Sequence, residues 1–109
     1  MAGRYCFYVG LEKDRDGRSI RNCPARVKKA LKKAARIFGG YSMVLQSGGW
    51  LDGKGKLVKE RSMKVEVLGS EGRGDRARVY GDFLRRAFRQ EVVVVTREEV
   101  WVEFFKKEE

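Results

Sequence analysis

The feature that most constrains this chain is the order in which two kinds of hydrophobic periodicity follow one another. Alternation of apolar and polar residues is typical of strands, whereas apolar residues at offsets of about 3, 4, 7 and 8 form one stripe of a helix. The alternating pattern begins at Tyr5, and the helical stripe begins at Pro24 and ends before Gly39 and Gly40. The segments read strand 5–11, helix 24–38, strand 41–46, strand 56–68, helix 75–89 and strand 92–105.

This order predicts an α+β fold in a single domain that covers residues 1–109. Two such strand–helix–strand units form a ferredoxin-like βαββαβ sandwich, an antiparallel sheet with both helices on one face. The Asp52-Gly53 pair is typical of a tight hairpin between the second and third strands. The last segment is either one long strand interrupted at 97–99 or a short strand followed by an extra C-terminal strand.

The composition narrows the class of protein. No apolar run approaches the 18 residues of a membrane span, and residues 1–10 do not read as a signal peptide, so we expect a cytoplasmic protein without membrane contact. Many charged residues and few amides are typical of a thermophile, the alternative being chance bias in a short chain. There is no histidine, and Cys6 and Cys23 lack metal-ligand spacing, so no metal or cofactor is expected. The two cysteines are either free thiols or a disulfide pair.

Strand alternation assigns the side chains of the sheet to two faces. The face toward the helices is predicted to hold Tyr5, Phe7, Val9, Met43, Leu45, Met63, Val65, Val67, Val100, Val102 and Phe104. The opposite face receives Cys6, Tyr8, Val44, Gln46, Trp50, Ser62, Lys64, Glu66, Trp101, Glu103 and Phe105. This second face is too aromatic for an ordinary wetted surface. We expect it to be a homodimer interface, a platform for a ligand or nucleic acid, or a surface that the chain's own loops cover.

The net charge of +10 is concentrated in the two predicted helices. The first holds six basic and no acidic residues, and residues 75–90 hold five basic and two acidic ones. A one-sided cationic layer attracts polyanions, and phosphate contacts need no sequence motif. We therefore predict contact with DNA or RNA without sequence specificity, the alternative being a solvated helix face. The predicted contact residues are Arg26, Lys28, Lys29, Lys32, Lys33, Arg36, Arg78, Arg85, Arg86 and Arg89. A weaker anion signal is the glycine-rich segment 69–74 before the second helix.

One carboxylate is a candidate for chemistry. Without histidine, acid–base catalysis falls to residues such as Glu60, which the hairpin places across from Trp50 and whose pKa an apolar neighbour would raise. The alternative is a plain salt bridge to a neighbouring cation such as Arg61. The possible ligand or interface residues are Tyr8, Gln46, Trp50, Glu60, Ser62 and Trp101.

Residues 47–67, SGGWLDGKGKLVKERSMKVEV, resemble the signature of a family of small, mostly bacterial proteins known only as a domain of unknown function. The signature G-x-W-x-D-x-x-G-x-L-x-x-E-x-S is filled here by Gly48, Trp50, Asp52, Gly55, Leu57, Glu60 and Ser62. A looser likeness continues through Tyr80, Phe83, Phe88, Gln90, Glu91 and Val93. The resemblance implies the same fold and groups Trp50, Glu60 and Ser62 into a unit, but it implies no activity. A viral or plasmid origin is a further hypothesis.

Taken together, the sequence favours a small basic binding protein, more readily non-enzymatic than catalytic, that contacts nucleic acid or another polyanion. The alternatives are a binder of a small anionic ligand or nucleotide at the hairpin and open sheet face, or an enzyme that uses Glu60. No catalytic residue is assigned.

Overall fold

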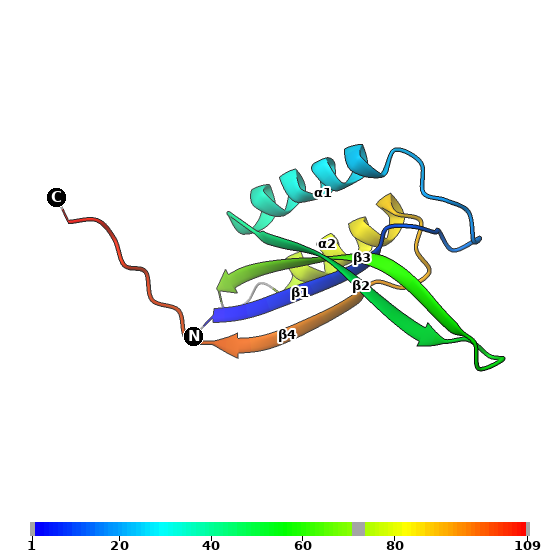
Figure 1. Ribbon diagram of the computed structural model, residues 1–109. Coiled ribbons are helices and arrows are strands. Elements are labelled where there is room, and N and C mark those ends of the chain that lie inside the picture. The colour runs from blue at the N-terminus through cyan, green and yellow to red at the C-terminus, as the bar shows by residue number, and fades with distance from the viewer. Residues whose placement is uncertain (1, 71–73, 109) are drawn as a thin grey trace.

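Within residues 2–70 and 74–108, which the computed structural model describes, four strands and two helices form in the predicted order (Figure 1). The elements are β1 (Ala2–Gly10), α1 (Cys23–Phe38), β2 (Ser42–Leu51), β3 (Leu57–Ser70), α2 (Gly74–Ala87) and β4 (Val94–Val100). The sheet order is β2-β3-β1-β4, and every neighbouring pair is antiparallel. Both helices cover the same face of this sheet (Figure 1). The ferredoxin-like prediction is therefore confirmed. Residues 71–73 of the glycine-rich segment lie outside the described residues.

Helix α1 begins and ends where local chemistry dictates. Pro24 lies in the first turn, where its missing N–H has no helical partner to lose. At the other end Gly39 adopts a left-handed conformation with φ 84°, and its N–H donates to the Ala35 carbonyl at 2.8 Å. The buried residues of the helix are Ala30 and Ala34, small side chains that bring α1 close to the sheet.

Tyr80 of α2 joins the two layers of the sandwich. Its ring meets the ring of Phe7 from β1 edge-on at 4.9 Å and the ring of Phe38 from α1 at 5.8 Å between centroids. Its hydroxyl donates to the Ala30 carbonyl at 2.8 Å, and burial raises the pKa of this phenol, so the donor proton stays in place. Beside it, a Cβ at Gly81 would lie only 3.3 Å from Val95, so glycine permits the close approach of helix and sheet. The core comprises Tyr5, Phe7, Val9, Ala30, Ala34, Met63, Val65, Val67, Ala77, Tyr80, Leu84 and Phe88.

The β2–β3 hairpin is longer than the sequence indicated. Strand β2 continues past Gln46 through the glycine pair to Leu51, where the prediction had ended it at 46. The tip is an Asp turn, because the Asp52 carboxylate accepts from the backbone N–H groups of Lys54 and Lys56, and Gly55 takes a φ of 78°. The hairpin projects beyond the helices as a twisted two-stranded ribbon (Figure 1).

Strand β4 corrects part of the predicted face assignment. Its register pairs Phe7 with Val95 and Tyr5 with Arg97, so the odd-numbered residues of β4 face the helices. Val100, Val102 and Phe104 were assigned to that face on the wrong parity, because four consecutive valines at 92–95 give no alternation from which to read it. No strand follows Val100 within the described residues up to 108, so no extra C-terminal strand forms and Phe104 is exposed. Leu45 is also exposed, because the helices do not extend over this part of β2.

Among the described residues there is no helix of the length and hydropathy that crossing a membrane would require. Cys6 is a buried free thiol and Cys23 a half-buried one, so the two do not form a disulfide here. Burial raises the pKa of the Cys23 thiol, which keeps it in the unreactive protonated form.

We expect Tyr80→Phe to destabilise the protein by about 1 kcal/mol, because it removes a buried hydrogen bond but preserves the aromatic packing. In a domain of this size that loss lowers Tm by about 4–8 °C, which thermal unfolding followed by circular dichroism will measure. Tyr41→Phe is the matched control, since Tyr41 is exposed. Equal Tm values for wild type and Tyr80→Phe would show that the hydroxyl does not hold the layers together.

Candidate functional site

The carboxyl group of Glu60 lies where β1 ends and only the β2–β3 hairpin continues. Glu60 of β3 pairs with Gly48 of β2, and its carboxylate lies over Gly10, the last residue of β1. A Cβ at Gly10 would collide with this carboxylate and would lie 2.9 Å from Oε1 of Gln90. Glycine at the end of β1 is therefore what admits Glu60 and Gln90 to the same place.

The surroundings of Glu60 raise its pKa. Loss of solvent is the largest cause, and repulsion from Glu12 adds to it, while the backbone N–H of Lys13 donates to the carboxylate and opposes both. The segment that carries Lys13 is held by Gln90, whose Nε2 donates to the carbonyls of Lys13 and Phe88, each at 2.9 Å. The carboxyl thus sits among three segments and is more basic than an ordinary glutamate.

The pairing register places most of the predicted ligand residues on the same face as Glu60. Gln46 pairs with Ser62, Trp50 with Val58, and Tyr8 with Lys64. The side chains of these three pairs lie on the sheet face away from the helices, as does that of Glu60. Trp50 lies two residues nearer the hairpin tip than Gly48, so it is a diagonal neighbour of Glu60. The unit of Trp50, Glu60 and Ser62 is thus brought to one face by the register. Trp101 is not part of it, because it lies beyond the end of β4.

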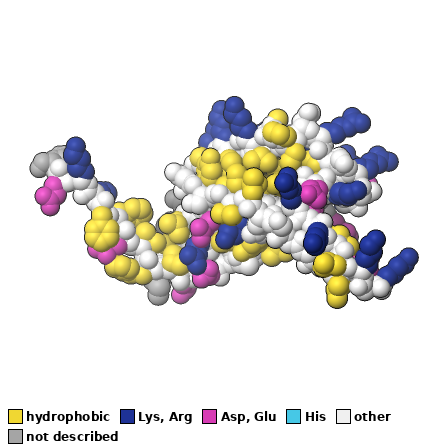
Figure 2. Space-filling view, in the orientation of Figure 1, with side chains coloured by type: hydrophobic (Ala, Val, Ile, Leu, Met, Phe, Trp, Pro, Cys, Tyr) yellow, Lys and Arg dark blue, Asp and Glu magenta, His cyan; other side chains and the backbone are white. Residues whose placement is uncertain are grey.

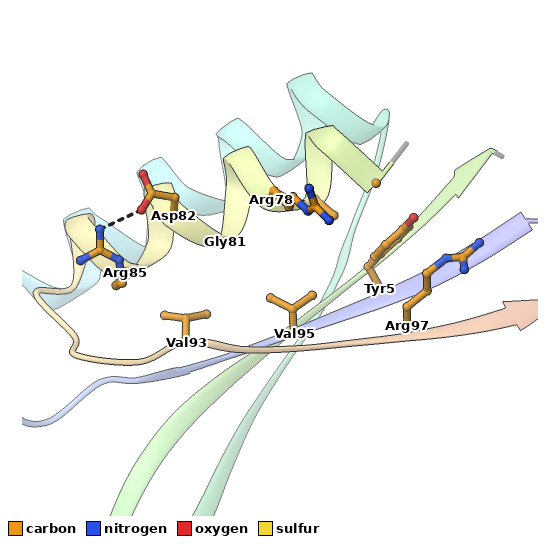
Figure 3. Close-up of a pocket in the computed structure, with 10 residues that line it drawn as sticks. Tyr5, Arg78, Gly81, Asp82, Arg85, Val93, Val95 and Arg97 are labelled. Carbon is orange, nitrogen blue, oxygen red and sulfur yellow. Dashed lines mark hydrogen bonds and ion pairs between the residues drawn. The ribbon is translucent and has the colours of Figure 1, made fainter. Parts of the chain in front are cut away.

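Apart from the Glu60 face, a groove runs between α2 and β4 on the helix side of the sheet (Figure 3). It has a volume of about 670 Å³, and Arg78, Arg85 and Arg97 surround it. The Arg97 guanidinium carbon lies 5.9 Å from the centre of the Tyr5 ring. Arg85 bonds Asp82 at 2.8 Å, and that bond, with the charges of Arg86 and Arg85, lowers the pKa of Asp82.

A further cavity, of about 750 Å³, lies under the hairpin beside the start of α1. Its apolar lining comes from the β1–α1 connection, from α1 and from the helix-facing side of β2. The apolar residues are Leu11, Pro24, Val27, Met43 and Leu45. Gln46 and Ser62, a cross-strand pair, also border it, so this cavity and the Glu60 face adjoin the same part of the hairpin.

The structure divides the predicted polyanion residues into two groups. Arg26 donates to the Arg21 and Ala87 carbonyls, Arg85 and Arg86 pair with Asp82, and Arg89 pairs with Asp14 and Asp16, so these four arginines serve the fold. The other six have no acidic partner among the described residues: Lys28, Lys29, Lys32, Lys33, Arg36 and Arg78. The Lys33 ammonium lies 4.7 Å from the centre of the Phe83 ring. All of these six residues except Arg78 lie on α1, the helix at the top of Figures 1 and 2.

Comparison with known proteins gives structural neighbours but no family. No profile of a known family and no curated protein matches the chain. A phage SAM lyase in complex with S-methyl-5′-thioadenosine aligns with a TM-score of 0.66 and 26% identity, over 90% of this chain and 81% of that one. The apo state of a phage SAM lyase aligns at 0.64 and 23%, over 95% and 92% of the two chains. CutA from Synechococcus elongatus PCC7942 aligns at 0.58 with 7% identity, over 89% and 74%. At 7% identity, CutA supports the fold alone.

Sequence reasoning missed three contributors to the Glu60 surroundings. Gly10 ends a strand pattern like any other turn glycine, and Lys13 contributes only its backbone N–H, which no side-chain pattern reveals. Gln90 follows α2 and is far from Glu60 in the chain. Gln90 belongs to the looser part of the family likeness, but that likeness does not place it beside Glu60.

The raised pKa of Glu60 predicts the pH dependence of stability. A carboxyl whose pKa is raised in the folded state contributes stability below its usual pKa of 4.5, and this contribution is lost as the pH rises through the raised value. We therefore expect Glu60→Gln to have a higher Tm than wild type at pH 8, and the difference to vanish near pH 3.5. Thermal unfolding across this pH range will measure it.

Asp82→Asn is a control of opposite sign. The pKa of Asp82 is lowered, so its contribution is present above its usual pKa of 3.8 and is lost as the pH falls. Asp82→Asn should therefore be less stable than wild type at pH 8. A Glu60→Gln variant that is also less stable at pH 8 would contradict the desolvation of Glu60.

Proposed function

We propose that this chain binds S-adenosylmethionine at the Glu60 face and cleaves it to S-methyl-5′-thioadenosine. The observation that carries the proposal is the 26% identity, over 90% of the chain, to a phage SAM lyase bound to S-methyl-5′-thioadenosine. The predicted use of Glu60 by an enzyme, earlier an alternative to non-enzymatic binding, becomes the first candidate. It draws further support from the chemistry of this face.

The Glu60 face suits a sulfonium cation. S-adenosylmethionine carries a positive charge on sulfur, and cations of this kind are bound by aromatic rings and carboxylates. Trp50 and Glu60, diagonal neighbours on one face, offer both types of group. The helix face, by contrast, is cationic and would repel the sulfonium. The raised pKa of Glu60 marks a partly desolvated carboxylate, which attracts a cation more strongly than a fully hydrated one does.

Cleavage to the thioether breaks the bond between sulfur and the γ-carbon of the methionyl part. The electron pair of that bond goes to sulfur, which becomes neutral, and no external reductant or oxidant is needed. Two balanced routes exist without water. In an elimination, Glu60 removes a proton from the β-carbon and an unsaturated amino acid results; in an internal substitution, the substrate's own carboxylate attacks the γ-carbon and a lactone results. Glu60 acts as a base in the first route and as an electrostatic anchor in the second.

A second candidate function is polyanion contact, and it is favoured by a specific feature of α1. Lys28, Lys29, Lys32 and Arg36 are exposed on this helix without an acidic partner among the described residues. Like charges one turn apart repel and so destabilise the helix, and a bound polyanion would relieve this repulsion. This surface lies on the opposite side of the molecule from the Glu60 face, so the two functions are compatible.

The lyase proposal predicts formation of S-methyl-5′-thioadenosine when the purified protein is incubated with S-adenosylmethionine, measured by liquid chromatography and mass spectrometry. Glu60→Gln should lower the rate by about 100-fold or more, the usual loss on removing an acid–base group. Glu66→Gln is the matched control, with the same charge change on the same strand and face. Substrate deuterated at the β-carbon separates the routes, because only elimination loses deuterium. A wild-type protein that neither forms the thioether nor binds either compound by calorimetry would refute the proposal.

The polyanion candidate predicts a salt-dependent interaction. Four phosphates neutralised by α1 give a slope of about −3.6 in log affinity against log salt, and replacing Lys28 and Lys32 by glutamine should reduce its size by about 2. Electrophoretic shift or fluorescence anisotropy with a DNA oligonucleotide across a salt series will measure this. Replacing Arg85 and Arg86, which already pair with Asp82, is the control and should change the slope less. No shift at low salt would remove the candidate.

A further inference from the structure

The two edges of the sheet are protected very differently. The order β2-β3-β1-β4 makes β2 and β4 the edge strands. Strand β4 carries Arg97, Glu98 and Glu99, charges of the kind that keep an exposed edge from pairing with another chain. Strand β2 runs from Ser42 to Leu51 without one charged residue or proline. Its exposed side chains include Val44, Leu45, Trp50 and Leu51. A long, uncharged, apolar edge of this kind is a template for a further strand.

The same chain carries an apolar segment with almost nothing packed against it. After β4, the segment 101–105 holds Trp101, Phe104 and Phe105, which are 78%, 76% and 91% exposed. The segment has no secondary structure and extends away from the body of the molecule (Figures 1 and 2). Exposure of three large aromatic side chains within five residues indicates a contact surface. Aromatic and β-branched residues here are those that strands favour.

The segment cannot lie along β2 of its own chain. It leaves the sheet at the end of β4, and three strand spacings, about 14 Å, separate β4 from β2. Strand β4 ends opposite Ala2, whereas β2 begins at Ser42, which aligns through Glu66 with Cys6, about 13 Å further along the sheet. These two offsets combine to a straight-line distance of about 19 Å, whereas five extended residues cover about 17 Å, so the backbone of the segment stops short of β2. Phe104 does border a shallow pocket with Tyr41 and Ser42.

We propose that residues 101–105 of one copy of this chain add as a strand to the free edge of β2 in a second copy. The added strand would satisfy the unpaired backbone groups of β2. Alternate side chains of the strand would lie on the two faces of the sheet, and one set would cover the apolar cavity lined by Leu11, Val27, Met43 and Leu45. Donor segment and acceptor edge are different surfaces, so the contact closes either as a reciprocal exchange between two copies or as a ring.

The first test is the mass of the protein in solution, measured by light scattering and native mass spectrometry without ligand. We expect the full chain to be an oligomer and two variants to be monomers of about 12 kDa: one that ends at Val100, and Leu45→Lys, which places a charge on the β2 edge. Val79→Lys is the matched control and should remain oligomeric, because Val79 is 60% exposed on α2 and Leu45 is 65% exposed. Circular dichroism confirms that each variant is folded.

The second test is complementation between the two variants. The shortened chain keeps a free β2 edge, and the Leu45→Lys chain keeps its 101–105 segment. An equimolar mixture should therefore form a one-to-one heterodimer although neither variant self-associates. An oligomer that survives the shortening would mean that the copies meet through β2 alone or through the open sheet face, and would overturn the proposal. A monomeric full chain would overturn it as well. Both results are independent of whether the protein cleaves S-adenosylmethionine.

Discussion

The geometry of this molecule depends on the unequal rise of helices and strands. A helix advances about 1.5 Å per residue and a strand about 3.3 Å, so α1 with 16 residues spans about 24 Å while β3 with 14 residues spans about 46 Å. The helices therefore cover only about half of β3. The uncovered half, paired with β2, continues as a ribbon beyond the helices. With this ribbon at one end and the extended C-terminal segment at the other, the molecule is 58 Å long but only 28 and 25 Å across (Figure 1). The Glu60 face, the apolar cavity under the hairpin and the free β2 edge all arise from this mismatch.

The Glu60 carboxyl owes its properties to its position at the boundary between sheet and ribbon. Strand β1 stops at Gly10, so β3 loses one of its two neighbours just as it reaches Glu60. Backbone from the β1–α1 connection occupies the vacated place and supplies the Lys13 N–H. A carboxylate here has protein on one side and water on the other, which is enough to raise its pKa but not to bury it. Two residues further inward, at position 62, the side chain would instead lie opposite Gly10 of β1.

Elements with a periodic apolar pattern can be predicted from this sequence, whereas contacts that depend on single residues in loops or on the folded structure cannot. The apolar stripe of 24–38 gave α1 to within one residue, and the alternation around Phe7 and Val65 placed both side chains in the core. Four successive valines at 92–95 carry no alternation, so the faces of β4 were assigned wrongly. Composition located the excess charge on the helices, but the pairing of Arg89 with Asp14 joins residues far apart in the chain and depends on the folded structure. The Glu60–Trp50 relation followed from hairpin register, whereas Gly10 and Gln90 enter through loops that have no periodicity.

The β2–β3 hairpin carries both the proposed edge contact and the Glu60 face, so the contact would change the surroundings of Glu60. Because β2 is the edge strand of the sheet, a strand added along its outer edge would lie one interstrand spacing, about 5 Å, from Gln46, Gly48 and Trp50. Under the proposed exchange, a second copy would therefore border the Glu60 face and remove water from one side of it. Loss of water strengthens the attraction between a carboxylate and a sulfonium, since the effective dielectric falls. A face that is half-open in one chain would become, in the oligomer, a site that can hold a reactive cation away from bulk water.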